Sequence, residues 1–139
     1  MSEKPGEAVA VVVDVANVVG SVPDGWWRDR AGAATRLLAR LAPLADAVAE
    51  VEGPDGSPIA IGRIVAVVEG AAKAASAPDG VELVAAPADG DTTIAELAHG
   101  PAGEGAPVLV VTADRGLRAR LPAAAAVAGP GWLNALVGR

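Results

Sequence analysis

Four acidic residues follow apolar runs of the sequence, and carboxylates in such positions can bind a metal ion. They are Asp14, Glu69, Asp91 and Asp114. We predict that each run is a strand of a parallel sheet, whose carboxyl ends meet at one edge where ligands bind. Carboxylates that converge there repel one another unless a divalent cation neutralises them. Because oxygen ligands without His or Cys suit Mg²⁺ or Mn²⁺, the pattern predicts such an ion at this edge.

The same acids have a structural alternative, since an acid after a strand is commonly a helix cap or a solvated turn residue. Glu69 fits this alternative, and Asp114 in the segment 112–114 (TAD) fits an N-cap as well as a ligand. Asp14 is followed three residues later by Asn17, whose amide could fix the carboxylate rotamer by a hydrogen bond. Both interpretations stay open from the sequence.

Residues 25–30 (GWWRDR) combine two adjacent Trp with two Arg. Adjacent residues point in different directions on a helix or a strand, so we expect one Trp in the core and the other near the surface. The structural alternative is that both Trp close a core of small residues. As a binding site, a Trp beside Arg28 and Arg30 could stack bases while the guanidinium groups hold phosphates, as in sites for single-stranded nucleic acid.

The composition excludes several other kinds of site. The chain has 139 residues, of which 52% are hydrophobic and 20% charged, and we predict one globular domain over residues 1–139. The absence of Cys excludes disulfides, thiol nucleophiles and Cys-ligated metals. The lone His99 excludes a multi-histidine metal site within one chain, and we expect it to cap a helix C-terminus before Gly100.

The charge distribution allows local basic surfaces on an acidic protein. The net charge of −6 opposes non-specific attraction to nucleic acid. Seven of the eleven cations nevertheless fall in two short stretches, residues 28–40 and 115–120. The polar N-terminus leads into an apolar run that is too short for a signal peptide or a membrane span, so we expect a cytoplasmic protein.

The apolar pattern alternates between strands and helices. Strands are expected at residues 8–13, 64–68, 81–84, 108–111 and 124–128, and helices at 37–48, 91–98, 115–121 and 130–137. Pro43 is expected to kink or split the first helix. Residues 53–58 form a loop, and 59–61 are either a short extra strand or the start of the next one. This alternation predicts an α/β fold with an open, mostly parallel sheet.

Four segments together resemble the NYN domain, a branch of the PIN-like nucleases. They are residues 14–21 (DVANVVGS), 23–30 (PDGWWRDR), 91–94 (DTTI) and 110–115 (VVTADR). The opening is similar to a small stand-alone bacterial group that carries the PDGWWRDR segment. The resemblance spans almost the whole chain and implies a PIN-like three-layer sandwich, with a central sheet of about five strands flanked by helices. It also implies metal-dependent hydrolysis of phosphodiester bonds, most often in RNA.

Site residues follow from this resemblance by position. Asp14 would be the first-strand metal acid, Asn17 its neighbour in the same motif, Asp91 the acid that opens the helix after the third strand, and Asp114 the acid of the Thr-x-Asp motif. Glu69 would be a further metal ligand, although the acid near the second strand varies in such folds.

The chain departs from the family pattern at Thr92, where a second acid is expected beside Asp91. Whether Asp89 substitutes for that acid stays open. The loss of one ligand would lower the metal affinity or mark a degenerate enzyme.

These observations predict a ribonuclease that uses Mg²⁺ or Mn²⁺ held by Asp14, Asp91 and Asp114, with the ion activating water and stabilising charge on the attacked phosphate. The residues expected to contact the substrate are Asn17, Trp26, Arg28, Arg30, Thr112 and Arg115. The alternatives are a nucleotide pyrophosphohydrolase that uses the same site and a PIN-like module that binds RNA or protein without cleavage. The expected partner is single-stranded RNA or a nucleotide and not a membrane, and a homodimer is left open.

Overall fold

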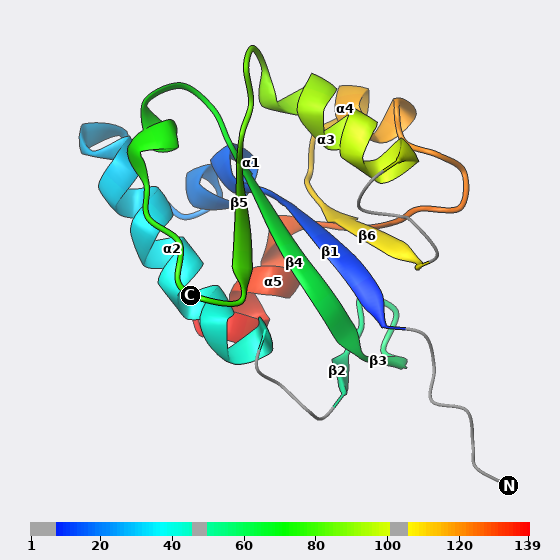
Figure 1. The fold of residues 1–139 in the computed structure, drawn as a ribbon. Coiled ribbons are helices and arrows are strands. Elements are labelled where there is room, and N and C mark those ends of the chain that lie inside the picture. The colour runs from blue at the N-terminus through cyan, green and yellow to red at the C-terminus, as the bar shows by residue number, and fades with distance from the viewer. Residues whose placement is uncertain (1–7, 46–49, 101–105) are drawn as a thin grey trace, which may run out of the picture.

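A parallel sheet forms the centre of the molecule. The computed structural model describes residues 8–45, 50–100 and 106–139, and within them five parallel strands pair in the order β5-β4-β1-β6-β7. They are β1 (Val9–Asp14), β4 (Ile61–Val68), β5 (Val81–Ala85), β6 (Val108–Val111) and β7 (Ala126–Ala128). Helices cover both faces of the sheet (Figure 1). The predicted α/β fold with three layers is therefore confirmed.

The central strand explains why its sequence is apolar without alternation. In β1, Val11 and Val13 contribute to the core on one face, whereas Val12 contributes to the core on the other. Val12 also pairs with β4 on one side and β6 on the other. A strand that is buried on both faces and paired at both edges exposes no face to water, so its sequence does not alternate between apolar and polar residues.

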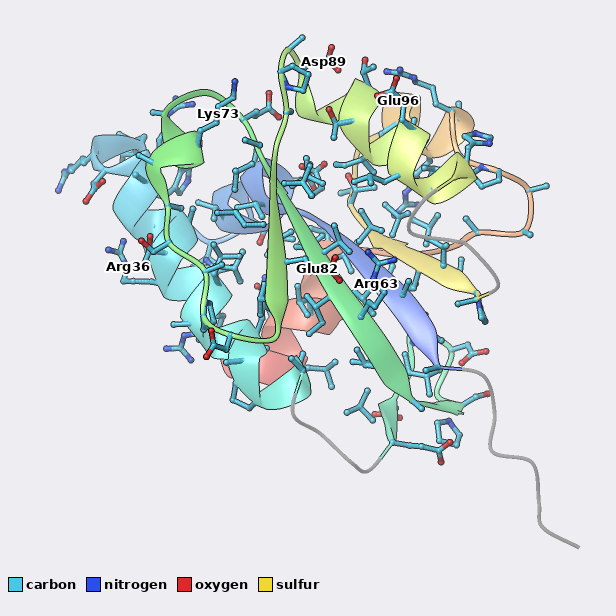
Figure 2. All side chains as sticks on the ribbon, viewed as in Figure 1. Arg36, Arg63, Lys73, Glu82, Asp89 and Glu96 are labelled. Carbon is cyan, nitrogen blue, oxygen red and sulfur yellow. The ribbon has the colours of Figure 1, made fainter. Side chains whose placement is uncertain are left out.

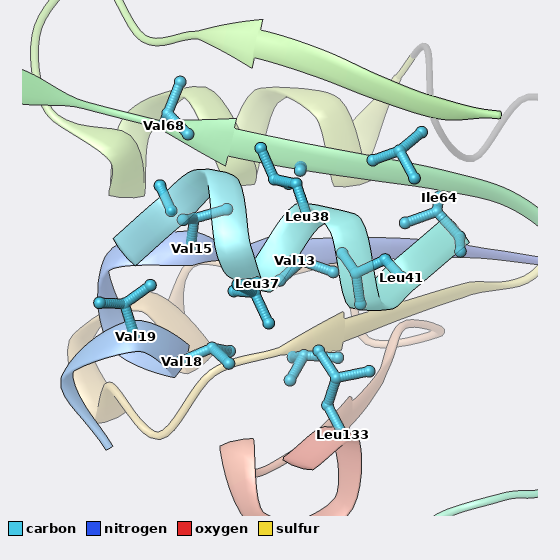
Figure 3. Packing of buried hydrophobic residues seen from close by; sticks show 14 of the residues in the cluster. Val13, Val15, Val18, Val19, Leu37, Leu38, Leu41, Ile64, Val68 and Leu133 are labelled. Carbon is cyan, nitrogen blue, oxygen red and sulfur yellow. The ribbon is translucent and has the colours of Figure 1, made fainter. Parts of the chain in front are cut away.

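The larger core lies beneath three helices, α1 (Val15–Gly20), α2 (Arg30–Ala45) and α5 (Pro130–Val137). Figure 3 shows Leu37, Leu38 and Leu41 of α2 against the valines of the sheet and of α1. On the opposite face, α3 (Gly90–His99) and α4 (Arg115–Ala119) cover the sheet with Ile94 and Leu117. Small and branched aliphatic side chains therefore fill both layers.

The first two helices differ from the prediction. The sequence did not predict α1, which starts directly after β1 without a loop. The prediction for α2 began at residue 37, but the helix begins at Arg30, where Asp29 Oδ1 accepts a hydrogen bond from the Gly32 N–H at 2.9 Å. Pro43 lies inside α2 and does not split the helix within the described residues. Val48, at the predicted helix end, lies outside the described residues.

The remaining elements are short. A hairpin of β2 (Val51–Glu52) and β3 (Pro58–Ile59) encloses the predicted loop, and β4 begins separately after it, so Ile59 belongs to an extra strand. Two 3₁₀ helices, η1 (Trp26–Arg28) and η2 (Gly70–Ala74), follow α1 and β4. In the described part of the chain, no helix combines the length and apolarity needed to cross a membrane.

Arg139 joins α5 to α1 and offers a test of this packing. Its side chain is only 9% exposed and donates to the Val18 carbonyl at 3.2 Å and to Asn134 Oδ1 at 2.9 Å. Burial lowers the pKa of the guanidinium, which remains protonated at neutral pH. Arg139→Ala leaves the oxygen of the buried Asn134 amide without this donor, whereas the Val18 carbonyl keeps its bonds from Ser21. We therefore expect a loss of about 2 kcal/mol in the free energy of unfolding, measured in urea. Arg115→Ala, at an exposed position, is the control and should change it little; equal stabilities would contradict the prediction.

Candidate functional site at the carboxyl edge of the sheet

Asp14 at the end of β1 and the segment after β6 lie side by side at the carboxyl edge of the sheet. The chain leaves β1 toward α1 on one face and leaves β6 toward α4 on the other. Since β1 and β6 are parallel neighbours, their carboxyl ends form a topological switch point. In open α/β sheets, ligands bind in the crevice at such a point.

Two protein hydrogen bonds fix the Asp14 carboxylate. Oδ1 accepts from the Asn17 backbone N–H at 3.3 Å, and Oδ2 accepts from the Thr112 hydroxyl at 2.9 Å. Thr112 is fully buried, and its hydroxyl oxygen also accepts from the Asp114 N–H at 3.1 Å. Asp14 thus combines an N-cap of α1 with a fixed carboxylate that is 5% exposed.

Asn17 does not bond to Asp14 through its side-chain amide, which corrects the sequence prediction. Its Oδ1 instead accepts from the Ala113 N–H at 2.7 Å. The side chain therefore bridges the first turn of α1 and the loop after β6. The hydrogen bonds of Asn17 and Thr112 therefore connect the end of β1 and the start of α1 to the loop after β6.

The electrostatics of Asp14 link it to two other acids. Burial raises the pKa of the Asp14 carboxyl, and the hydrogen bonds from Thr112 and Asn17 oppose this rise. The negative charges of Asp91 and Glu69 add to it. These carboxylates are therefore close enough to Asp14 for repulsion, as expected for acids that converge on one site.

Asp91 connects the remaining acids. It lies in the first turn of α3, and burial raises the pKa of its carboxyl, with further contributions from Asp114, Asp89 and Glu69 and an opposing one from Arg120. No hydrogen bond to the Asp91 carboxylate occurs within the part of the chain that the structure describes. Asp91 is thus an acid with like-charged neighbours and no capping role.

Asp114 and Asp89 do have capping roles. Asp114 caps α4 by accepting from the Leu117 N–H at 3.0 Å. Asp89 caps α3 by accepting from the Thr92 N–H at 2.8 Å and the Thr92 hydroxyl at 3.1 Å. These bonds lower the pKa of Asp89. Thr92 is therefore the capping partner of Asp89.

Glu69 is not a cap, because its side chain makes no capping bond to η2. Its carboxylate lies against Gly90 at the start of α3, where a Cβ would stand 2.7 Å from Oε1. Gly90 thus provides space for an acid from a neighbouring strand end. This role of Glu69 was not predicted from the sequence, although a glycine directly before Asp91 is a signal for close approach.

The donor chemistry of this site fits a hard cation. Asp14, Asp91, Asp114 and Glu69 offer only oxygen ligands, and burial, together with repulsion between the acids, raises the pKa of Asp14 and Asp91. Within residues 8–45, 50–100 and 106–139, however, no three His, Asp or Glu side chains are already grouped to hold one ion. The acids are therefore coupled by charge without forming a closed set of ligands.

Two hollows flank α1 next to Asp14. The deeper one, of about 270 Å³, lies between α1, η1, α2 and the start of η2; its lining includes Trp26, Arg30 and Glu69. The wider and shallower one, of about 500 Å³, lies on the other side of α1, toward α5, and its lining includes Asn17, Ser21 and Asn134. The predicted substrate residues Asn17, Trp26 and Arg30 therefore line space beside the acids.

The two Trp of the GWWRDR segment separate as predicted. Trp26 is half-buried and packs against the larger core, whereas Trp27 is 52% exposed. Their ring centroids are 5.8 Å apart in an edge-to-face arrangement. The guanidinium of Arg28 lies 5.9 Å from the Trp27 centroid, and that of Arg30 lies 5.2 Å from the Trp26 centroid.

The arginines around α4 divide into structural and free groups. Arg118 donates to the Thr112 carbonyl at 3.0 Å, and Arg120 donates to the Thr92 hydroxyl at 3.1 Å. His99 Nε2 lies 2.9 Å from the Arg120 carbonyl, so it bonds to the chain after α4, and the cap of α3 is Gly100. Arg115 is exposed and makes no such bond within the described residues.

Comparison with known proteins supports the fold. No family model matches the sequence, and no match was found among curated proteins. A crystal structure of a mutant of Rae1 (YacP) from Bacillus subtilis is similar, with a TM-score of 0.68 and 18% sequence identity over 94% of this chain and 75% of that one. This likeness extends across nearly the whole chain and concerns the fold alone.

Proposed function

We propose that the protein is a metal-dependent nuclease and that its substrate is RNA. The observation that carries the proposal is the buried Asp14 carboxylate at the switch point, with a pKa raised by burial and by the charges of Asp91 and Glu69. Such a group is costly to fold unless it binds something positive. The resemblance of four sequence segments to the NYN domain adds support, because it implies that Asp14, Asp91 and Asp114 are metal ligands.

The chain's own residues would hold the reacting groups. A bound Mg²⁺ or Mn²⁺ would supply Lewis acidity and lower the pKa of a bound water. Thr112 and the Asn17 N–H orient Asp14, and Asp91 and Asp114 provide the remaining negative charge. Asp114 keeps its position through its bond to α4.

Single-stranded RNA fits the surroundings of the acids. Trp27 offers an exposed ring for base stacking, and Arg28 lies next to it. Arg115, at the start of α4, directly follows Asp114. Cations on both chain segments that flank the acids would draw a phosphate backbone across the site despite the net negative charge of the chain.

The test is cleavage of a labelled single-stranded RNA with Mn²⁺ and with EDTA, alongside release of pyrophosphate from nucleoside triphosphates. Cleavage that requires Mn²⁺ supports the nuclease. Release of pyrophosphate without RNA cleavage would instead assign the same site to free nucleotides, and RNA binding without either reaction would make the protein a binding module.

The basic residues give a separate prediction. The double variant Arg28→Ala/Arg115→Ala should bind RNA more weakly and with a flatter salt dependence, because each phosphate contact contributes about 0.7 to the slope of log K against log salt for single strands. Fluorescence titrations at several salt concentrations measure this slope. Arg36→Ala, an exposed arginine on the outer side of α2 (Figure 2), is the control. A slope equal to that of the wild type would remove both arginines from the RNA path.

A further inference from the structure

The hollow of about 270 Å³ beside the acids has apolar walls and two opposite charges. Its lining includes Val15, Ala16, Val19, Trp26, Arg30 and Glu69. The volume is slightly below the usual range of about 300–1,000 Å³ for ligand pockets, so it suits one flat ring system better than a larger ligand. Aliphatic side chains and a Trp ring are the surfaces on which a nucleobase packs.

Arg30 and Glu69 both line this hollow, but they do not form an ion pair with each other. Arg30 contacts the ring of Trp26, and Glu69 lies against Gly90. Within the described residues, neither side chain makes a hydrogen bond or an ion pair, although both border the same hollow. A guanidinium and a carboxylate that face one space separately can bind complementary edges of a single ligand.

We propose that this hollow binds a guanine base. Guanine presents acceptors at O6 and N7, which a guanidinium recognises in a bidentate manner. It also presents donors at N1 and at the 2-amino group, which a carboxylate can accept in parallel. Adenine has an amino group in place of O6 and an acceptor at N1, so it would oppose both Arg30 and Glu69. Cytosine and uracil lack the second ring that spans from one side chain to the other.

The proposal deepens the proposed function and rests on it for the role of the base in RNA. With a guanine in the hollow, its phosphate would lie near Asp14, because Val15 and Ala16 of the lining directly follow Asp14 in the chain. Glu69 then recognises the base, and the metal would be left to the three aspartates. Cleavage next to guanine would follow.

Gly90 provides an independent way to disturb the carboxylate. Gly90→Ala introduces a Cβ that would stand 2.7 Å from Glu69 Oε1, so the carboxylate has to move. Alanine is otherwise favourable in the first turn of a helix. The variant should therefore keep its melting temperature while it shifts Glu69 away from its present position.

The experiment is calorimetric binding of 5′-GMP and 5′-AMP to the intact chain in EDTA. We expect the wild type to prefer 5′-GMP by about tenfold, within the range of one bidentate contact to a base edge. Glu69→Gln should remove this preference by weakening 5′-GMP alone. A mere loss of negative charge would instead strengthen the binding of both anionic nucleotides, so the sign separates recognition from general electrostatics.

The remaining variants complete the test. Arg30→Ala and Gly90→Ala should also reduce the preference for 5′-GMP, whereas Glu96→Gln and Arg36→Ala, both at exposed positions (Figure 2), should leave it unchanged. Equal binding of the two nucleotides, absence of binding, or an unchanged preference in Glu69→Gln would overturn the inference. Because the assay uses neither metal nor cleavage, a protein that binds 5′-GMP but does not cut RNA fails only the proposed function. A nuclease without base preference fails only this inference.

Discussion

Asp14→Asn should lower the rate of RNA cleavage by at least about a hundredfold while the protein stays folded. The substitution removes the buried negative charge on which cation binding depends. Loss of a residue that only hydrogen-bonds to a metal ligand already lowers metal affinity or activity by about 10- to 100-fold. The fold should tolerate the change, because the asparagine oxygen can accept from the Asn17 N–H and its amino group can donate to the Thr112 hydroxyl oxygen. Single-turnover cleavage of a labelled RNA with Mn²⁺ measures the effect.

The matched control is Glu96→Gln, which removes one negative charge from an exposed position on α3. It should cleave at the wild-type rate. RNA binding by Asp14→Asn should persist, because we place the RNA contacts on the arginines and Trp27. If Asp14→Asn retained more than about a third of the activity, Asp14 would be a structural cap of α1 and the nuclease site would have to lie elsewhere.

The sequence was sufficient for the sheet because residues 9–13 of β1, residues 64–68 of β4 and all of β6 are continuous apolar runs. Burial on both faces makes such runs recognisable without tertiary information. The helix α1 was missed because its six residues are rich in valine, which favours strands. Its three valines, Val15, Val18 and Val19, are nevertheless all buried. Their i, i+3, i+4 spacing was the available signal for a helix.

The acids of the site were predictable because each one ends or follows an element, but their separate roles were not. Asp114 and Asp89 both precede a helix, and only the structure shows that both cap one. The contact between Glu69 and Gly90 joins separate segments of the chain, so the glycine before Asp91 signals a close approach but does not identify Glu69 as its partner. The sequence therefore predicted the carboxyl edge of the sheet as the place of the acids. Which of these carboxylates cap a helix is known only from the structure.

Asp91→Asn should raise the melting temperature of the metal-free protein at pH 7 and remove most of its stabilisation by Mn²⁺. Burial and the neighbouring acids raise the pKa of Asp91 in the folded state. The folded protein therefore binds this proton more tightly than the unfolded chain does, and stability is lost as the pH rises from about 3.8 through the folded pKa. Asparagine removes this penalty, so we expect a rise of about 1–3 °C at pH 7 that disappears near pH 3.

Asp89→Asn is the matched control, at a residue labelled in Figure 2. Asp89 lies two residues before Asp91, and its bonds to Thr92 shift its pKa in the opposite direction. This variant should melt at the same temperature as the wild type or lower. Mn²⁺ at a hundred times its dissociation constant stabilises a protein that binds it only when folded by about 2.7 kcal/mol, or about 8 °C for a chain of this size. We expect this shift for the wild type and for Asp89→Asn, and a much smaller one for Asp91→Asn. Melting curves of the three proteins with and without Mn²⁺ decide the matter: a destabilised Asp91→Asn together with no response of the wild type to Mn²⁺ would show that these acids serve only the fold.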